Sequence, residues 1–184
     1  MLRSLSFALA ITVISGCTTN LRVAPIDDKT GLLASESVVK AKATVVVDKA
    51  ASLSHFGGVV FVSDTGEFAI RQMQATRLFE RVLSFDDWQR VVAKEGLSQR
   101  VPSLNEPIGL SNLAKAYRPF LWVGSKKAVR EDKAYMQFIA TDAETLEVLF
   151  TAEIAMPYYL REVSDQNMRY PLFNEFIAWV RRNP

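Results

Sequence analysis

The N-terminal apolar segment most constrains what this chain can fold into, because it decides where the folded part begins. Residues 5–14 form an uncharged, mainly apolar stretch preceded by Arg3 and followed by Ser15 and Gly16. A helix that crosses a bilayer needs about 20 apolar residues, so this stretch is too short to span one. Its length of about ten residues is that of the apolar part of a secretory signal peptide. The sequence therefore predicts that residues 1–16 are a targeting segment and contribute nothing to the fold.

The single cysteine of the chain, Cys17, directly follows this segment. Ile14-Ser15-Gly16-Cys17 resembles the lipobox of bacterial lipoproteins, which implies that the thiol is acylated and that Cys17 becomes the first mature residue. An ordinary signal peptide with an unmodified thiol, or a buried N-terminal helix, is the alternative. With one cysteine no internal disulfide can form, so a free thiol in an oxidising compartment would be a liability. We therefore favour lipidation, and two or more acyl chains would anchor the protein stably to a membrane.

The residue after the cysteine bears on the compartment. The resemblance to lipoproteins implies that Thr18, rather than an aspartate, directs the protein to the outer membrane. The expected location is thus the periplasmic face of that membrane.

The charge balance of the chain excludes one class of partner. The sequence has 22 basic and 20 acidic residues, a formal net charge of +2, and no cluster of lysine or arginine. Nucleic-acid binding normally leaves a basic patch or stripe, so we expect no nucleic-acid partner. Residues 17–35 are turn-rich and without periodicity, and they are predicted to form a flexible tether that reaches about 60 Å when fully extended. Residues 36–184 are then expected to form one globular domain.

Alternating apolar and polar residues predict the strands of this domain. Every second residue from Val39 to Val47 is apolar, which is the period of a half-buried strand. The run Val59–Ser63 is apolar without alternation, and its composition leaves strand and helix start open. Further strands are expected at four places: Phe79–Leu83, Phe120–Gly124, Ala134–Thr141 and Glu147–Met156, the last two joined in a hairpin by residues 142–146.

Helical spacing and end signals predict four helices. They are expected at residues 67–78, residues 84–96, residues 108–117 and from Pro171 to Arg182. The second is the clearest, because Ser84 can cap its first turn and Gly96 can end it. The last begins with a proline and carries arginines in its last turn. Trp88 and Phe176 lie on apolar stripes of the second and last helices and are expected to be buried.

This order of elements resembles one group of envelope proteins, namely the TolB N-terminal domain, the lipoprotein activators of penicillin-binding proteins and the curli secretion lipoprotein. Three stretches of the sequence carry the resemblance: Phe79-Glu80-Arg81-Val82, Phe120-Leu121-Trp122-Val123-Gly124 and Asp142-Ala143-Glu144-Thr145. The resemblance implies an α/β (α+β) single domain with a mainly antiparallel or mixed sheet of four to five strands packed by helices.

The sequence also departs from the group in two ways. Leu146 stands where the group usually has glycine, so we expect a turn that does not use glycine's freedom at positive φ. The sequence also gives no sign of the long membrane-inserting hairpins that the curli pore requires, which weakens the channel interpretation.

The sequence offers little catalytic chemistry. His55, the only histidine, lies in a predicted loop with no acidic partner near it in sequence, and we expect a solvated side chain. A zinc site needs three or four histidine, cysteine or carboxylate ligands, and this chain has one histidine and no cysteine besides Cys17. No metal site and no cofactor are therefore expected. Four carboxylates lie on or near predicted loops: Glu131, Asp132, Asp142 and Glu144. They lack the spacing of a calcium loop, and we expect no enzyme, although a small carboxylate-based hydrolase remains a third hypothesis.

The segment before the last helix is the candidate contact surface. Tyr158, Tyr159 and Tyr170, together with Arg161, lie there without periodicity, and tyrosine and arginine are enriched at interface hot spots. The alternative is that the tyrosines pack this segment onto the sheet.

Together these features lead to the hypothesis of a non-catalytic accessory lipoprotein. The lipid on Cys17 would anchor it to the outer membrane, and it would bind and position or regulate an envelope protein partner. The second hypothesis is an oligomeric subunit of a secretion or channel assembly.

Overall fold

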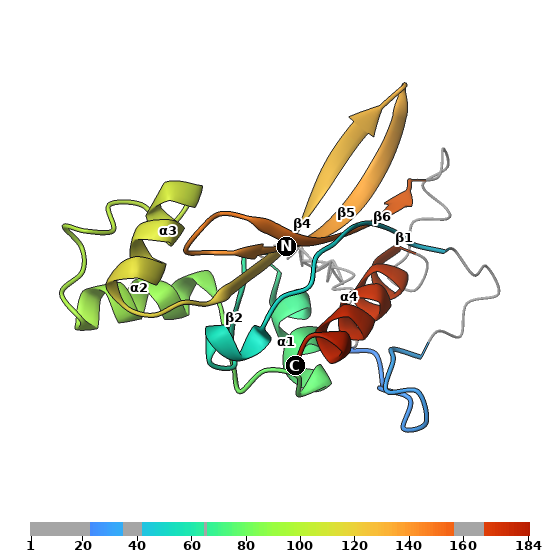
Figure 1. Ribbon diagram of the computed structural model, residues 1–184, viewed down its shortest axis with the longest axis horizontal. Coiled ribbons are helices and arrows are strands. Elements are labelled where there is room, and N and C mark those ends of the chain that lie inside the picture. The colour runs from blue at the N-terminus through green and yellow to red at the C-terminus, as the bar shows by residue number, and fades with distance from the viewer. Residues whose placement is uncertain (1–22, 35–41, 65, 157–167) are drawn as a thin grey trace, which may run out of the picture.

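The computed structural model describes residues 23–34, 42–64, 66–156 and 168–184, which form a mixed sheet covered by helices (Figure 1). The strands are β1 Thr44–Asp48, β2 Val59–Val62, β3 Arg81–Leu83, β4 Leu121–Arg130, β5 Lys133–Asp142 and β6 Val148–Ala155. The helices are α1 Glu67–Thr76, α2 Phe85–Lys94, α3 Pro107–Ala116 and α4 Tyr170–Arg182, with a 3-10 turn, η1, at Leu53–Phe56. The four helices predicted from the sequence are confirmed, with bounds that differ by one or two residues at most ends.

The sheet has six strands in the order β1-β6-β5-β4-β2-β3. The pairs β1–β6, β6–β5 and β5–β4 are antiparallel, whereas β2 pairs in parallel with both β3 and β4. The mixed α+β class is thus confirmed, but the expected number of four to five strands is wrong. The ambiguous run at Val59 is a strand, β2, and all four of its residues are buried. A strand covered on both faces shows no alternation, which is why periodicity could not identify it.

One face of the sheet packs on α1 and α4. Val60 and Val62 of β2 and Leu121 and Val123 of β4 contribute to this core, which Phe176 of α4 fills with no exposed surface. The phenylalanine ring lies 5.0 Å from that of Phe138 and 5.9 Å from that of Phe150, centroid to centroid. The prediction that Phe176 is buried is confirmed.

A second, smaller core lies on the opposite face at the β2–β3 end of the sheet. Val59 and Phe61, the alternate residues of β2, pack there with α2 and α3. Trp88 of α2 is fully buried against Phe120, at 4.6 Å between ring centroids, as its stripe predicted. Ser84 caps α2 in a complete capping box with Asp87. The two cores therefore share β2 and β4, whose alternate side chains point to opposite faces.

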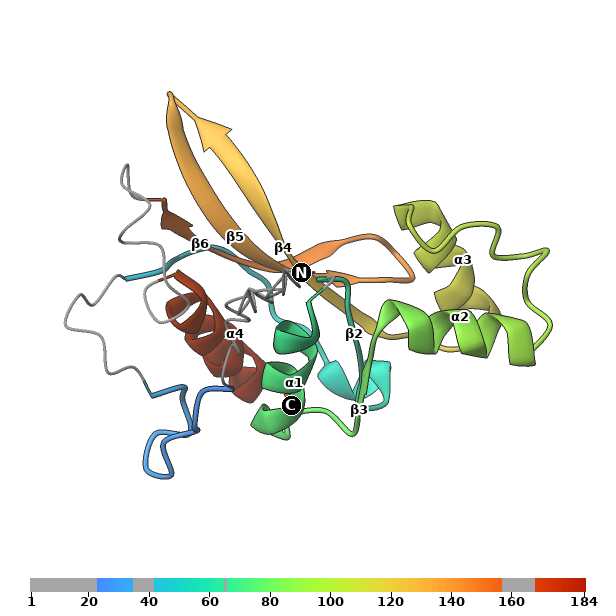
Figure 2. The same ribbon diagram turned by 180° about the vertical axis from the view of Figure 1, so that it is seen from behind.

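β4 and β5 continue past the body of the sheet as a long hairpin, which the sequence analysis did not predict (Figures 1 and 2). Each strand has ten residues, and the register runs unbroken from Leu121 opposite Asp142 to Arg130 opposite Lys133. Glu131 and Asp132 form the turn, both with positive φ. This pair of left-handed residues matches the twist of the strands, so the turn forms without a glycine at some cost in strain.

Residues 23–34 fall in the range where a flexible tether was expected, yet they pack against α1 and α4. Ala24 and Leu33 are buried in the larger core, and Ile26 and Leu33 form an isolated antiparallel bridge. The division into signal peptide, tether and domain stays a prediction. Its boundary is shifted, however, because the described part of the expected tether belongs to the folded body.

Candidate functional site

The face of the sheet opposite α1 and α4 carries a groove of about 290 Å³. Figures 1 and 2 show α2 and α3 at one end of the sheet, so the described helices leave this face open near the hairpin. The groove is lined by Ser63, Pro107, Trp122, Gly124, Ser125, Lys126, Ile139, Thr141, Leu146 and Val148. Most of these side chains are apolar, with Lys126 as the charged residue.

The sheet register explains how these residues come together. Trp122 lies opposite Thr141, and Gly124 lies opposite Ile139, so all four side-chain positions share one face. A Cβ on Gly124 would overlap the Ser63 hydroxyl, which itself donates to the Val123 carbonyl at 3.1 Å. Because Gly124 has no side chain, it leaves this part of the groove unfilled. Apolar clefts with a few polar groups are the usual form of binding sites.

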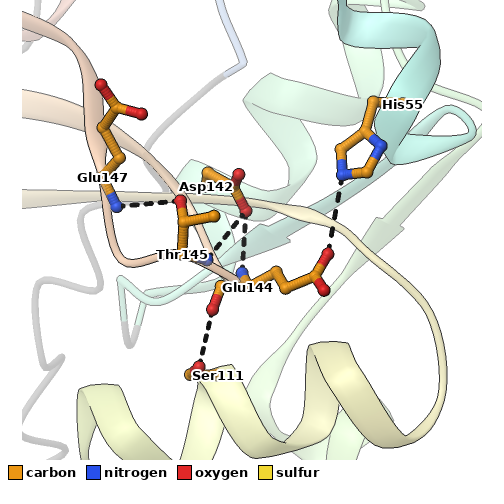
Figure 3. Close-up of polar contacts among 6 residues, drawn as sticks. All are labelled: His55, Ser111, Asp142, Glu144, Thr145 and Glu147. Carbon is orange, nitrogen blue, oxygen red and sulfur yellow. Dashed lines mark hydrogen bonds and ion pairs between the residues drawn. The ribbon is translucent and has the colours of Figure 1, made fainter.

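The β5–β6 turn forms one wall of the groove and is held by its own polar groups (Figure 3). The Asp142 carboxylate accepts from the Glu144 amide at 2.8 Å and from the Thr145 amide at 3.4 Å. The Thr145 hydroxyl accepts from the Glu147 amide at 3.3 Å. Side chains that satisfy neighbouring backbone amides fix a turn locally, so this wall is rigid.

Two further contacts dock the turn on the domain. Ser111 of α3 donates to the Glu144 carbonyl at 2.7 Å, and the Ala143 amide donates to the Phe120 carbonyl at 3.2 Å. Ala143 is fully buried as a result. The turn is thus attached to α3 and to the residue before β4.

Leu146 in this turn has a φ of +62°, contrary to the sequence expectation that a leucine would rule out positive φ. Its amide donates to the Asp142 carbonyl at 2.8 Å, a bond that closes the turn. A side chain with a Cβ is strained in the left-handed region, by roughly 1–2 kcal/mol. The turn therefore has a left-handed residue without glycine, and Leu146 contributes an apolar side chain to the groove.

His55 has an acidic neighbour that the sequence could not reveal. Its Nε2 lies 3.7 Å from Oε2 of Glu144, and both side chains are partly exposed (Figure 3). The distance is too long for a hydrogen bond. The hydroxyl of Ser111, on α3, donates to the Glu144 carbonyl. The imidazole and the carboxylate therefore lie side by side at the surface of the turn, and these contacts include no nucleophile–base hydrogen bond.

A charged cluster lies further along the same face and links the hairpin, near its tip, to β6. Glu153 of β6 accepts from Gln137 at 2.9 Å and from Arg130, whose guanidinium also lies 4.5 Å from the centroid of the Tyr135 ring. Burial works to raise the pKa of Glu153, but the hydrogen bonds and the charge of Arg130 outweigh it and lower this pKa below its ordinary value. The cluster therefore ties the end of β4 and the middle of β5 to β6.

The sequence-predicted site residues fall mostly outside the described part of the chain. Cys17, Tyr158, Tyr159 and Arg161 all lie outside it. Tyr170, the first residue of α4, is described and is 7% exposed within the larger core. The prediction that this segment binds a partner stays a prediction, and Tyr170 itself presents little surface.

The described residues contain neither a cluster suited to a metal ion nor a helix suited to crossing a membrane. Within them, no group of three or more histidine, cysteine, aspartate or glutamate side chains is placed to hold a metal ion. None of the helices in this part of the chain has the length and apolar character needed to cross a membrane. The four carboxylates expected on loops do lie at turns, Glu131 and Asp132 in the hairpin and Asp142 and Glu144 in the β5–β6 turn.

Comparisons with known proteins give weak similarities. No family model matches the chain, and no curated protein matches it. Among solved structures, the LpoB C-terminal domain from Escherichia coli is 15% identical with a TM-score of 0.32, over 55% of this chain and 83% of that one. A dodecamer of a PelC variant from Paraburkholderia phytofirmans is 11% identical with a TM-score of 0.28, over 63% of this chain and 81% of that one. At these scores neither similarity defines the fold or the function.

Proposed function

We propose that this chain is an accessory lipoprotein of the bacterial envelope, anchored through lipid on Cys17, which binds a protein partner without catalysing a reaction. The lipobox-like Ile14-Ser15-Gly16-Cys17 supports the anchor and, with Thr18, the outer membrane as its location. The groove on the open sheet face is the single observation that carries the binding role.

The character of the groove supports a protein partner. Trp122, Ile139, Leu146 and Val148 give it apolar side chains, and Val148 is 36% exposed. Exposed apolar side chains that gather around a cleft are typical of interaction sites. The rigid β5–β6 turn keeps one wall fixed, which lowers the entropic cost of binding. The Asp142 carboxylate of that wall is engaged in holding the turn, and this supports a binding role over a carboxylate-based hydrolase.

Photo-crosslinking in intact cells tests the binding role. A photoreactive amino acid is placed at Lys126 or at Val148 in the groove, and at Glu95 as an exposed control beyond α2. We expect a discrete crosslinked species from the two groove positions and none from the control. Mass spectrometry of that species identifies the partner. Equal or absent crosslinking at all three positions would contradict the assignment of the groove, and crosslinks to a second copy of this chain would favour the oligomeric assembly.

The anchor has a separate test. Replacing Cys17 by Ser removes the acylation site, so the protein should lose fatty-acid labelling and leave the membrane fraction. Retention of the variant in the membrane fraction, together with an unlabelled wild type, would contradict the lipoprotein assignment.

A further inference from the structure

Residues 23–34, here called the strap, are joined to the domain by hydrogen bonds that span much of the chain. The Gln72 side chain of α1 accepts from the Ala24 amide at 2.7 Å and donates to its carbonyl at 3.4 Å. The Asn174 side chain of α4 makes the same pair of bonds to Leu33, at 2.7 Å and 3.2 Å. Each amide side chain thus satisfies both backbone groups of one strap residue, as a neighbouring strand would.

The outer part of the strap is also held. Arg181 of α4 donates to the carbonyls of Thr30 and Gly31 at 2.8 Å and 3.0 Å. Asp27 accepts from the Thr30 amide at 2.8 Å and closes the loop internally. With Ala24 and Leu33 buried at 3% and 4% exposure, the strap is anchored at both ends and in its middle. It therefore behaves as part of the folded body rather than as a free linker.

The strap lies on the far side of the molecule from the groove. It packs on α1 and α4, and these helices cover one face of the sheet, whereas the groove opens on the other face. Figures 1 and 2 both show the strap, drawn in blue, beyond α4, and the tip of the β4–β5 hairpin on the opposite side of the sheet.

We infer that the strap orients the domain on the membrane, with α1 and α4 toward the bilayer and the groove and hairpin directed away from it. This inference rests on the proposed anchor at Cys17. Six residue steps separate Cys17 from Val23, where the strap begins, and six fully extended residues span at most about 20 Å. A free tether through residue 34 would instead reach about 60 Å.

The size of the domain decides what this difference means. A folded domain of about 150 residues has a radius of gyration near 15 Å and a diameter of about 40 Å. A free tether of about 60 Å would exceed that diameter and allow every orientation. The connection from Cys17 to Val23, here called the leash, reaches only about 20 Å and cannot let the strap face point away from the bilayer. The partner that enters the groove is therefore one that approaches from the periplasm, not one embedded beside the anchor in the same membrane.

Energy transfer from protein to membrane tests this orientation. The full acylated chain is bound to phosphatidylethanolamine–phosphatidylglycerol vesicles that contain an acceptor-labelled lipid. A donor dye is attached to a single introduced cysteine, either Asp28→Cys in the strap or Lys133→Cys at the hairpin tip. Because Cys17 is the only native cysteine and is acylated, the dye reacts at one position. We expect several-fold more efficient transfer from position 28 than from position 133.

Two further variants show whether the short leash is the cause. A flexible Gly/Ser insertion of about 20 residues between Thr19 and Asn20 lengthens the leash and leaves the strap contacts in place. We expect the transfer ratio to fall toward one without a change in melting temperature. The double change Asn174→Ala, Arg181→Ala should also lower the ratio, because it removes the bonds to residues 30, 31 and 33.

The outcomes separate this inference from the proposed function. An acylated chain that gives equal transfer from both positions overturns the orientation and leaves the anchor intact. A ratio that the insertion does not change also overturns it, because the orientation would then not come from the leash. An intact mass without acyl chains on Cys17 overturns both the anchor and the orientation.

Discussion

At the scale of single residues, Leu146 shows how a strained backbone is kept where a surface needs it. Its φ of +62° is adopted because the turn is fixed from both sides, by Asp142 within the turn and by Ser111 from α3. Residues in sparsely populated backbone regions persist only where their surroundings over-determine them, and they often lie at binding sites. The position of Leu146 in the groove wall fits this pattern.

This strain predicts an inverted order of stability for two substitutions. Leu146→Ala removes the side chain but keeps a Cβ at positive φ, whereas Leu146→Gly removes both. We expect the glycine variant to have the higher free energy of unfolding of the two, by about 1 kcal/mol. In a helix interior the order is the reverse. Urea unfolding of both variants measures the difference, and an alanine variant of equal or greater stability would contradict the strain.

The Glu153 cluster predicts how stability depends on pH. The pKa of Glu153 is lowered in the folded state from an ordinary value of 4.5. A carboxylate with a depressed pKa stabilises the fold above its unfolded pKa, and this contribution is lost as the pH falls through the folded pKa. The free-energy difference between the wild type and Glu153→Gln should therefore be largest near neutral pH and shrink below about pH 4.5.

Urea unfolding at neutral and acid pH measures this difference, with the glutamine variant as the matched control because it cannot titrate. Other carboxylates titrate in both proteins and cancel in the comparison. A difference that stays constant across the pH range would show that Arg130 and Gln137 do not lower the pKa of the Glu153 carboxylate.

At the scale of elements, α2 begins with a capping box, and removing the Ser84 hydroxyl is enough to disrupt it. The Ser84 hydroxyl accepts from the Asp87 amide at 3.2 Å, and the Asp87 carboxylate accepts from the Ser84 amide at 2.8 Å. Ser84→Ala should lower the free energy of unfolding by about 1 kcal/mol. Ser98→Ala, at an exposed position just after the helix, should change it little. Equal effects in chemical denaturation would contradict the role of the cap.

Local patterns made most of these elements predictable. Spacing and end signals within about 15 residues predict the apolar stripe and cap of α2, the paired strands β5 and β6, and helix α4. The β4–β5 hairpin was not predictable in this way. Residues 125–130 do not alternate, because both faces of the projecting hairpin are accessible, and its turn uses Glu131 and Asp132 in place of glycine or asparagine.

The groove and the strap depend on contacts that no local pattern encodes. Trp122 and Thr141 share a face only because of the β4–β5 register, and Leu33 meets Asn174 across 141 positions of sequence. The residues of the strap carry turn signals, which describe its own loop correctly but say nothing of the helices beneath it. The sequence indicated a candidate surface in aromatic residues instead, and of these the structure describes only Tyr170.

At the scale of the whole molecule, the two cores are coupled through the strands that they share. β2 gives Val60 and Val62 to the core under α1 and α4, and Val59 and Phe61 to the core under α2 and α3. Neither core can lose its packing without exposing one face of the same strand. We therefore expect the whole domain to unfold in one cooperative transition, although its helices lie on opposite faces.

The tryptophans provide a reporter for each core. Trp179 lies in the core under α1 and α4, and Trp88 lies in the core under α2 and α3. Two single-tryptophan proteins are made by changing the other two tryptophans to phenylalanine. The two reporters should give the same urea midpoint as far-ultraviolet circular dichroism measured on the same protein. Each replacement is itself mildly destabilising, so probes are compared within one protein and not between the two.

Phe176→Ala is then added to the protein that retains only Trp88. The removed ring lies in the core under α1 and α4 and should cost about 3–5 kcal/mol of unfolding free energy. Because β2 couples the faces, the midpoint of Trp88 fluorescence should fall as far as that of circular dichroism, although Phe176 and Trp88 belong to different cores. A Trp88 midpoint that does not move would contradict the coupling. It would mean that α2, α3 and the strand residues beneath them unfold as a separate unit.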